Sequence, residues 1–100
     1  MTKKITLAVN EVPIDLDYFV ETYLDHVAGG IIGSLQGTGE IEELNLTIDN
    51  EGQVRIDLNN CNVELKVFPV EIIRETLFGL VKPLKGVSGE VATMEINIIH

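Results

Sequence analysis

Apolar residues near the start of the chain recur at every second position, the period of a β-strand with one buried face. The alternation changes parity between residues 5–9 and 12–16, and a two-residue turn at Asn10-Glu11 restores a common apolar face. Since Pro13 has no N–H to donate, residues 12–16 are expected at the edge of a sheet. The predicted pairs in this hairpin are Val9 with Val12, Leu7 with Ile14 and Ile5 with Leu16.

From Asp17 onward, the apolar residues follow the spacing of a helix that turns one side to a core. Asp17 is the expected N-cap, because its carboxylate can accept hydrogen bonds from the first turn. Gly29, Gly30 and Gly33 each cost up to about 1 kcal/mol in a helix interior, so either the helix frays there or another backbone approaches closely. The expected core-facing residues are Phe19, Val20, Tyr23, Leu24, Val27, Ala28, Ile31, Ile32 and Leu35.

Alternation returns in residues 42–66, where two turn signals predict a three-stranded meander. Residues 49–53 fit a hairpin loop in which Gly52 takes a left-handed conformation. Asn59-Asn60 fits a second two-residue turn. The expected pairs are Ile48 with Val54, Leu46 with Ile56, Leu44 with Leu58, Leu58 with Cys61, Ile56 with Val63 and Val54 with Leu65.

A second helix is expected from Pro69, because the missing N–H of proline has no partner in a first turn. Pro83 must end or bend this helix. A last strand is expected within residues 91–99. The expected core-facing residues of the helix are Val70, Ile73, Leu77, Leu80, Val81 and Leu84.

The two halves of the chain repeat one order of elements, hairpin, helix and strand. Shared periodicity alone would arise in two such units of independent origin, but matched asparagines and glycines favour a duplication. An offset of 49 residues aligns Asn10 with Asn59, Leu16 with Leu65, Phe19 with Phe68, Gly30 with Gly79, Leu35 with Leu84 and Gly37 with Gly86. One inserted residue then aligns Leu44, Leu46 and Ile48 with Met94, Ile96 and Ile98.

These elements predict an α+β fold in a single domain over residues 1–100. The expected architecture has two layers, with six mainly antiparallel strands and two helices arranged as a pseudo-twofold ββαβ duplication. Its pseudo-repeats would span residues 5–48 and 54–98. The alternative reads each parity shift as a bulge in one long strand, which leaves a ferredoxin-like βαββαβ fold.

The composition of the chain argues against some classes of binding partner. Seven basic and sixteen acidic residues give a formal net charge of −9, which repels phosphate backbones and anionic lipid. Aromatic residues make up only 5% of the chain, so little is available for stacking on bases. We therefore expect no nucleic-acid partner and no membrane partner. A single cysteine and the absence of a secretory signal in residues 1–20 predict a cytoplasmic protein.

The polar residues do not form a recognisable catalytic pattern. His26 has no second His or Cys at helical ligand spacing, and it is expected at the surface. Cys61 lies on the apolar face of its predicted hairpin, so a buried, unreactive thiol is expected. The acidic groups around Asp17 and Glu42 are explained by helix capping and solubility. The sequence thus predicts no catalytic residue, no metal site and no cofactor.

Each half begins with a short alternating strand that ends in an asparagine at a turn. In the first half a second strand then leads to Phe19-Val20, and the helix ends in Ser34-Leu35-Gln36-Gly37. This unit resembles small prokaryotic proteins that carry no assigned activity, so the resemblance implies no function. Three hypotheses remain.

The favoured hypothesis is a non-catalytic structural or protein-interaction module that self-associates as a homodimer or binds another protein. Its expected interaction surface is Gly29, Gly30, Gly33 and Ser34, where a slim helix permits close approach. The second hypothesis is a small-molecule binding module with an apolar pocket between sheet and helices. The third, an enzyme that uses acidic residues and a cation, has the least support.

Overall fold

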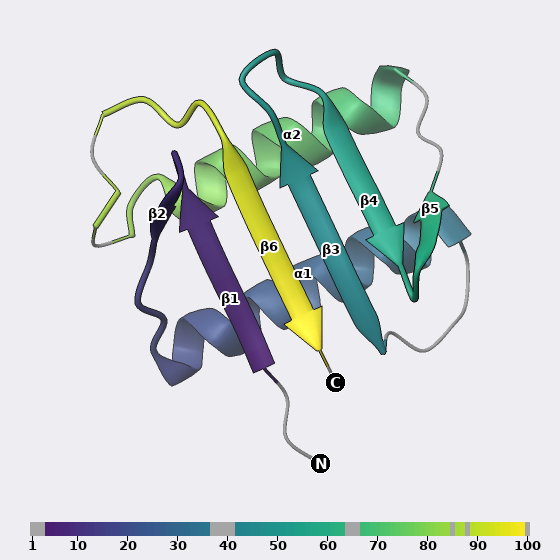
Figure 1. Ribbon diagram of the computed structural model, residues 1–100, viewed down its shortest axis with the longest axis horizontal. Helices are drawn as coiled ribbons and strands as arrows, with labels where there is room; N and C mark the ends of the chain where they lie inside the picture. Colours follow the sequence, from purple (N-terminus) through teal and green to yellow (C-terminus); the bar gives the residue numbers. More distant parts are fainter. Residues whose placement is uncertain (1–3, 37–41, 64–66, 85, 88, 100) are drawn as a thin grey trace.

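The computed structural model of the protein describes residues 4–36, 42–63, 67–84, 86–87 and 89–99 (Figure 1). Eight elements follow one another along the chain. They are β1 (Lys4–Val9), β2 (Val12–Pro13), α1 (Tyr18–Gln36), β3 (Glu43–Ile48), β4 (Val54–Leu58), β5 (Cys61–Val63), α2 (Val67–Val81) and β6 (Met94–Ile99).

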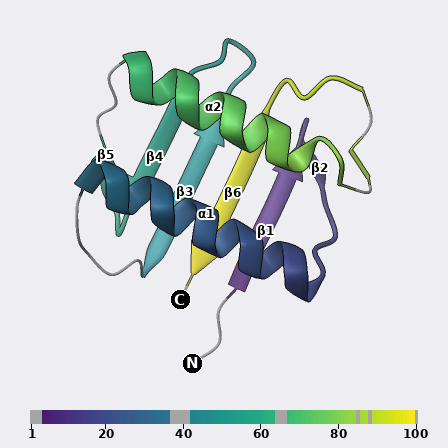
Figure 2. The ribbon, with the colours of Figure 1, turned by 180° about the vertical axis from the view of Figure 1, so that it is seen from behind.

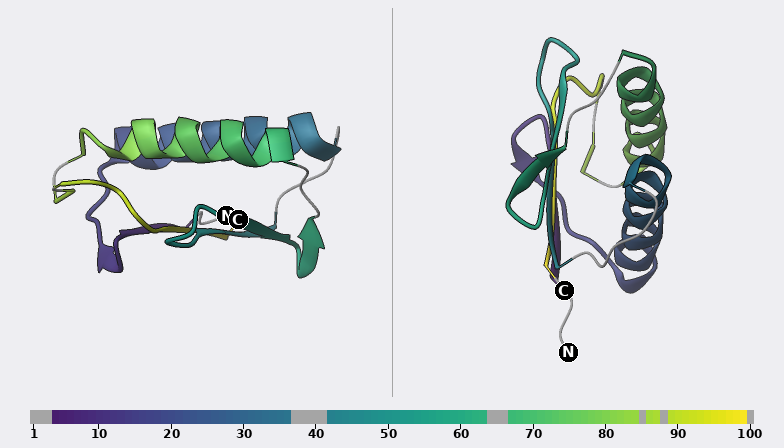
Figure 3. Two further views of the ribbon diagram at one scale, coloured as in Figure 1. Left: turned by 90° about the horizontal axis from the view of Figure 1, so that it is seen from above. Right: turned by 90° about the vertical axis from the view of Figure 1, so that its right-hand side faces the viewer.

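The strands form one six-stranded sheet in the order β2-β1-β6-β3-β4-β5. Every neighbouring pair is antiparallel. Both helices lie on one face of this sheet and run in opposite directions, while the other face is uncovered (Figures 2 and 3). The predicted two-layer α+β fold is therefore confirmed.

The chain makes a tight turn at each of the two places where the alternation of apolar residues changes parity. Asn10 and Glu11 have φ angles of 52° and 67°, and Asn59 and Asn60 have φ angles of 49° and 67°. Two successive residues with positive φ are typical of the type I′ turn that joins hairpin strands. The ferredoxin-like alternative is wrong, because the chain reverses direction at both places instead of continuing through a bulge.

The predicted hairpin registers hold where strands are present. Val9 faces Val12, and Leu58 faces Cys61. The hairpin of β3 and β4 pairs Ile48 with Val54, as expected. Its loop turns at Gly52, which has a φ of 81°. Residue 65 lies outside the described residues, so the last predicted pair of the meander stays a prediction.

The first hairpin is shorter than the sequence indicates. β2 is an edge strand, as Pro13 predicts, but it ends at that residue. The N–H of Ile14 still donates a hydrogen bond of 2.9 Å to the carbonyl of Leu7, whereas Leu16 lies outside the strand. Val12 is 53% exposed rather than buried, because a two-residue strand at the sheet edge lies at the margin of the core.

The helices begin where local chemistry favours a start. The carboxylate of Asp17 accepts a hydrogen bond of 2.8 Å from the N–H of Val20, which confirms the predicted cap. α2 begins at Val67, two residues before the predicted start. Pro69 thus lies within the first turn, where its missing N–H leaves no helical hydrogen bond unmade.

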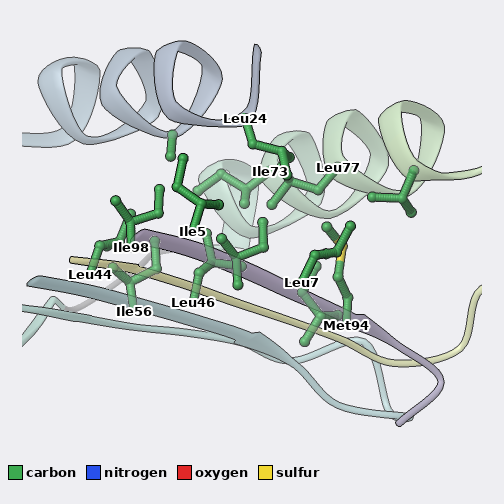
Figure 4. Close-up of a cluster of buried hydrophobic side chains, with 14 of the residues drawn as sticks. Ile5, Leu7, Leu24, Leu44, Leu46, Ile56, Ile73, Leu77, Met94 and Ile98 are labelled. Carbon is green, nitrogen blue, oxygen red and sulfur yellow. The ribbon is translucent and has the colours of Figure 1, made fainter. Parts of the chain in front are cut away.

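The core fills the space between the sheet and the two helices. Leu24, Ile73 and Leu77 project from the helices toward side chains such as Leu7 and Leu46 on the strands (Figure 4). These side chains are almost fully buried, and no described residue buries a polar or charged side chain. Leu24, Ala28 and Ile32 on α1 correspond to Ile73, Leu77 and Val81 on α2 at the offset of 49 residues, and all six are buried.

The strand order is symmetric under exchange of the two halves. β1, β2, α1 and β3 correspond to β4, β5, α2 and β6, and this exchange turns the strand order into its own reverse. Leu46 and Ile96 occupy equivalent positions and face each other at the centre of the sheet, so the pseudo-twofold axis passes through that pair. Common ancestry of the halves stays a prediction.

Each asparagine turn also holds the start of a strand from the opposite half. The side-chain oxygen of Asn10 accepts hydrogen bonds of 2.7 and 3.0 Å from the N–H groups of Ala92 and Thr93, just before β6. The side-chain oxygen of Asn59 accepts two hydrogen bonds of 2.9 Å from the N–H groups of Glu42 and Glu43, at the start of β3. We call these two contacts the asparagine latches.

The uncovered face of the sheet is polar. Residues that face one another across five strands form a row of Thr6, Asn97, Asn45, Asp57 and Asn62. The Asn97 amide donates a hydrogen bond to Asn45, and the Asn62 amide donates one of 3.4 Å to Asp57. A solvated face of this kind is usual for an antiparallel sheet with one covered side.

The latches predict different effects for two neighbouring substitutions. Asn59→Gly preserves access to positive φ but removes the side-chain oxygen, so it should lower the free energy of unfolding by about 1–2 kcal/mol. Asn60→Gly relieves a positive φ of 67° and should raise that free energy. Urea unfolding of both variants measures the difference, and equal effects would contradict the latch.

Candidate interaction surface

The four small residues that the sequence indicates as an interaction surface lie in the second half of α1. Gly30, Gly33 and Ser34 are exposed, and Gly29 is half-buried. A Cβ atom on any of these three glycines would meet no heavy atom within 4 Å beyond its own helix turns. α1 is also continuous through all of them. Neither fraying nor close approach by another described segment of the chain accounts for the glycines.

Three aromatic residues in the first half of α1 are exposed, namely Tyr18, Phe19 and Tyr23. Phe19 is 71% exposed and Tyr23 is 50% exposed. Their rings stack with centroids 5.8 Å apart and an angle of 10° between the planes. The prediction that both face the core was wrong. At about 100° per residue, they lie roughly 140° and 100° from Leu24. Only the structure shows that Leu24 marks the centre of the buried side, so the spacing alone did not indicate that the two rings are exposed.

A hydrogen bond from Arg74 shows which side of α2 faces away from α1. The guanidinium of Arg74 donates from Nη1 to the carbonyl of Gly52, at 3.0 Å, in the loop between β3 and β4. That loop lies on the side of α2 away from α1 (Figure 3). Ile72, about 200° around the helix from Arg74, therefore lies on the flank turned toward α1, and it is 49% exposed.

The equivalent side of α1 carries the two stacked aromatic rings, together with Gly30 and Ser34. Tyr23 corresponds to Ile72 at the offset of 49 residues, so it is turned toward α2. Phe19, Tyr23, Gly30 and Ser34 fall within a sector of roughly 60° around α1, and we call these four residues the α1 strip. The carboxylates of α1 belong to other parts of its circumference, so the strip is uncharged.

Cys61 is exposed, which corrects the expectation of a buried thiol. Its alternation with Val63 is as predicted, and Val63 is buried. Cys61 differs because it adjoins the turn at residues 59–60 and belongs to an edge strand of the sheet. Its neighbours in the sequence could not indicate this.

A shallow depression lies on the uncovered side of the sheet, where β3 ends and β6 begins. Its volume is about 350 Å³, and its lining includes Glu11, Thr47, Asp49 and Glu95. Asp49 uses Oδ1 to accept hydrogen bonds of 2.9 and 3.0 Å from two N–H groups of its own loop. That carboxylate therefore shapes the turn. The described residues contain no group of three His, Cys, Asp or Glu side chains placed to hold a metal ion.

Known proteins offer no template for these surfaces, since comparisons with family models, characterised proteins and solved structures found no match. Neither of the described helices is long and apolar enough to cross a membrane.

The exposure of Cys61 predicts a thiol that reacts in the folded protein. Ellman's reagent without denaturant should modify Cys61 at a rate within about tenfold of that in the urea-unfolded chain, because no described segment covers it. Modification only after unfolding would contradict the exposed position. Cys61→Ser is the blank for this measurement.

Proposed function

We propose that this protein is a non-catalytic interaction module that self-associates as a homodimer through α1. The contact would comprise the α1 strip together with Gly33, whereas Gly29 lies about 20° around the helix from Tyr18, outside this contact. The observation that carries the proposal is the stacked pair of Phe19 and Tyr23, which leaves 71% and 50% of these residues in solvent. Exposed free thiols are stable in a reducing compartment, so Cys61 is compatible with a cytoplasmic location.

Exposed aromatic side chains on this scale favour a partner. Burial of apolar surface contributes about 25 cal/mol per Å², and Tyr and Phe are enriched in the centres of protein interfaces. Only part of the aromatic surface of the α1 strip is covered by ring stacking. A partner that covers both rings would therefore gain free energy without rearrangement of the core.

The glycines support close approach by a helix from another molecule. Each costs up to about 1 kcal/mol relative to alanine in a helix interior, and a methyl group on Gly29, Gly30 or Gly33 would meet nothing within the described chain. Packing within the molecule therefore gives no reason for their small size. Approach by an external backbone gives one.

The order of large and small residues along the strip is self-complementary. In an antiparallel pair of α1 helices with a twofold axis between His26 and Val27, residue numbers in contact sum to 53. Phe19 of one copy then faces Ser34 of the second, and Tyr23 faces Gly30. Each aromatic ring of one copy thus meets a small residue of the other. The same pairs recur in both directions, as in any isologous contact between identical subunits.

Charge and area are compatible with this contact. A net charge of −9 makes two copies repel, so a contact between them is least costly on an uncharged surface such as the α1 strip. The molecule measures 35 × 35 × 18 Å, and both helices lie on a broad face. That face can supply the roughly 800 Å² per partner of a standard interface.

The alternative of a small-molecule pocket between sheet and helices has less support. The space between the layers holds the buried aliphatic side chains of both helices and all four long strands (Figure 4). A ligand there would have to displace close-packed groups, whereas a partner on α1 would displace only water.

Substitution of the aromatic residues tests the contact. The double variant Phe19→Ser, Tyr23→Ser should weaken dimerisation at least 30-fold, since loss of central interface side chains costs about 2 kcal/mol or more. Tyr18→Ser is the matched control, because Tyr18 is 82% exposed on the other flank of the same helix. Sedimentation velocity gives the dissociation constants. A monomeric parent protein at millimolar concentration would refute the proposal.

Substitution of a glycine separates stability from association. Gly30→Ala should raise the free energy of unfolding of the monomer by up to about 1 kcal/mol, yet weaken the dimer at least tenfold by keeping Tyr23 of the second copy away. Gly79→Ala, at the matching position of α2, should stabilise the monomer equally and leave the dimer unchanged. Thermal unfolding at low concentration and sedimentation at high concentration measure the two effects.

A further inference from the structure

The two halves of the chain are interleaved in the sheet. β1 and β3 belong to the first half, and β6 of the second half lies between them. β4 and β6 belong to the second half, and β3 of the first half lies between them. Each half alone would therefore leave a gap one strand wide, which only the central strand of the other half fills.

The two halves are covalently joined only where the chain passes from β3 to β4, and their other contacts are non-covalent. β6 pairs along its whole length with β1 and with β3. The asparagine latches also cross between halves, because Asn10 binds the segment before β6 and Asn59 binds the start of β3. The loop of residues 49–53 is the covalent link from β3 to β4.

That loop is held mainly by its own atoms. Asp49 accepts hydrogen bonds from the N–H groups of Glu51 and Gln53, and Gly52 donates one of 3.0 Å to the Asp49 carbonyl. Gly52 must also hold a φ of 81°, which an extended loop does not require. Arg74 adds one hydrogen bond to the loop from α2. If the loop opens, these few contacts are lost, but the strand pairings need not be.

We propose that a second copy of this chain can supply the missing half. In the exchanged dimer, the 49–53 loop is extended, and residues 4–48 of each copy pair with residues 54–99 of the other. Every strand pairing, both latches and the core are preserved in each of the two resulting units. This exchange is independent of the α1 contact, because it uses the sheet and the core rather than the outer face of the helices.

Shortening of the loop tests the exchange. Deletion of residues 50–53 leaves Asp49 alone between Ile48 and Val54, which face each other in the hairpin. One residue is too few for a reversal, since the shortest common hairpin loops have about two, but it preserves the alternation of a continuous strand. Light scattering should show twice the monomer mass, and circular dichroism should show unchanged helix and strand content.

A disulfide reports which chains are paired. Lys4 lies opposite Ile99 in adjacent antiparallel strands, at a separation that a disulfide can span. In the Cys61→Ser background, Lys4→Cys with Ile99→Cys should give a disulfide within one chain when the loop is intact. The same pair in the shortened chain should give a covalent dimer on a non-reducing gel.

A second arm uses the intact loop. Two chains, one with Lys4→Cys and one with Ile99→Cys, both carrying Cys61→Ser, are mixed at high concentration. They should form a covalent heterodimer after joint unfolding and refolding, and none when mixed while folded. Arg55→Cys in place of Ile99→Cys is the control that should give no heterodimer. Phe19→Ser with Tyr23→Ser should leave the yield unchanged, which separates this exchange from the α1 contact.

Two results would overturn the proposal. One is a shortened chain that is a folded monomer or loses its strand signal. The other is the absence of heterodimer after joint refolding, or a yield no greater than that of the Arg55→Cys control.

Discussion

The antiparallel pairing of β3 with β6 is the contact on which the other elements depend. These strands come from different halves of the chain, and each fills a gap that the other half leaves in the sheet. Leu46 faces Ile96 at their centre, and both are almost completely buried under the helices. Without this pair, neither ββαβ half has a continuous sheet on which its helix could pack.

The asparagine latches extend this dependence to the turns. A positive φ at the first turn position would also suit glycine, so backbone conformation alone does not explain Asn10 and Asn59. Their side-chain oxygens each accept two N–H groups at the start of a strand from the other half. One residue type thus reverses the chain within its own half and positions a strand of the other half.

Polar side chains are concentrated on the uncovered side of the sheet, whereas exposed aromatic rings lie on the helical side. The uncovered face of the sheet carries a row of hydrogen-bonding side chains and is suited to water. The α1 strip is uncharged, and its two rings are exposed on an otherwise strongly acidic molecule. An exchanged dimer would use neither face, since it forms through the central strands. The two proposed associations therefore depend on different parts of the fold.

Local periodicity and turn chemistry determined the elements and their registers. Alternation gave the strand faces, and Asn10, Asn59 and Gly52 indicated where the chain reverses, because both signals depend only on neighbouring residues. Tertiary structure alone decided which apolar positions stay exposed. Phe19 and Tyr23 are apolar residues at helical spacing, yet they lie in the exposed α1 strip. Their exposure depends on the angle at which the helix sits on the sheet, and that angle is set by packing of the whole core rather than by the residues beside them.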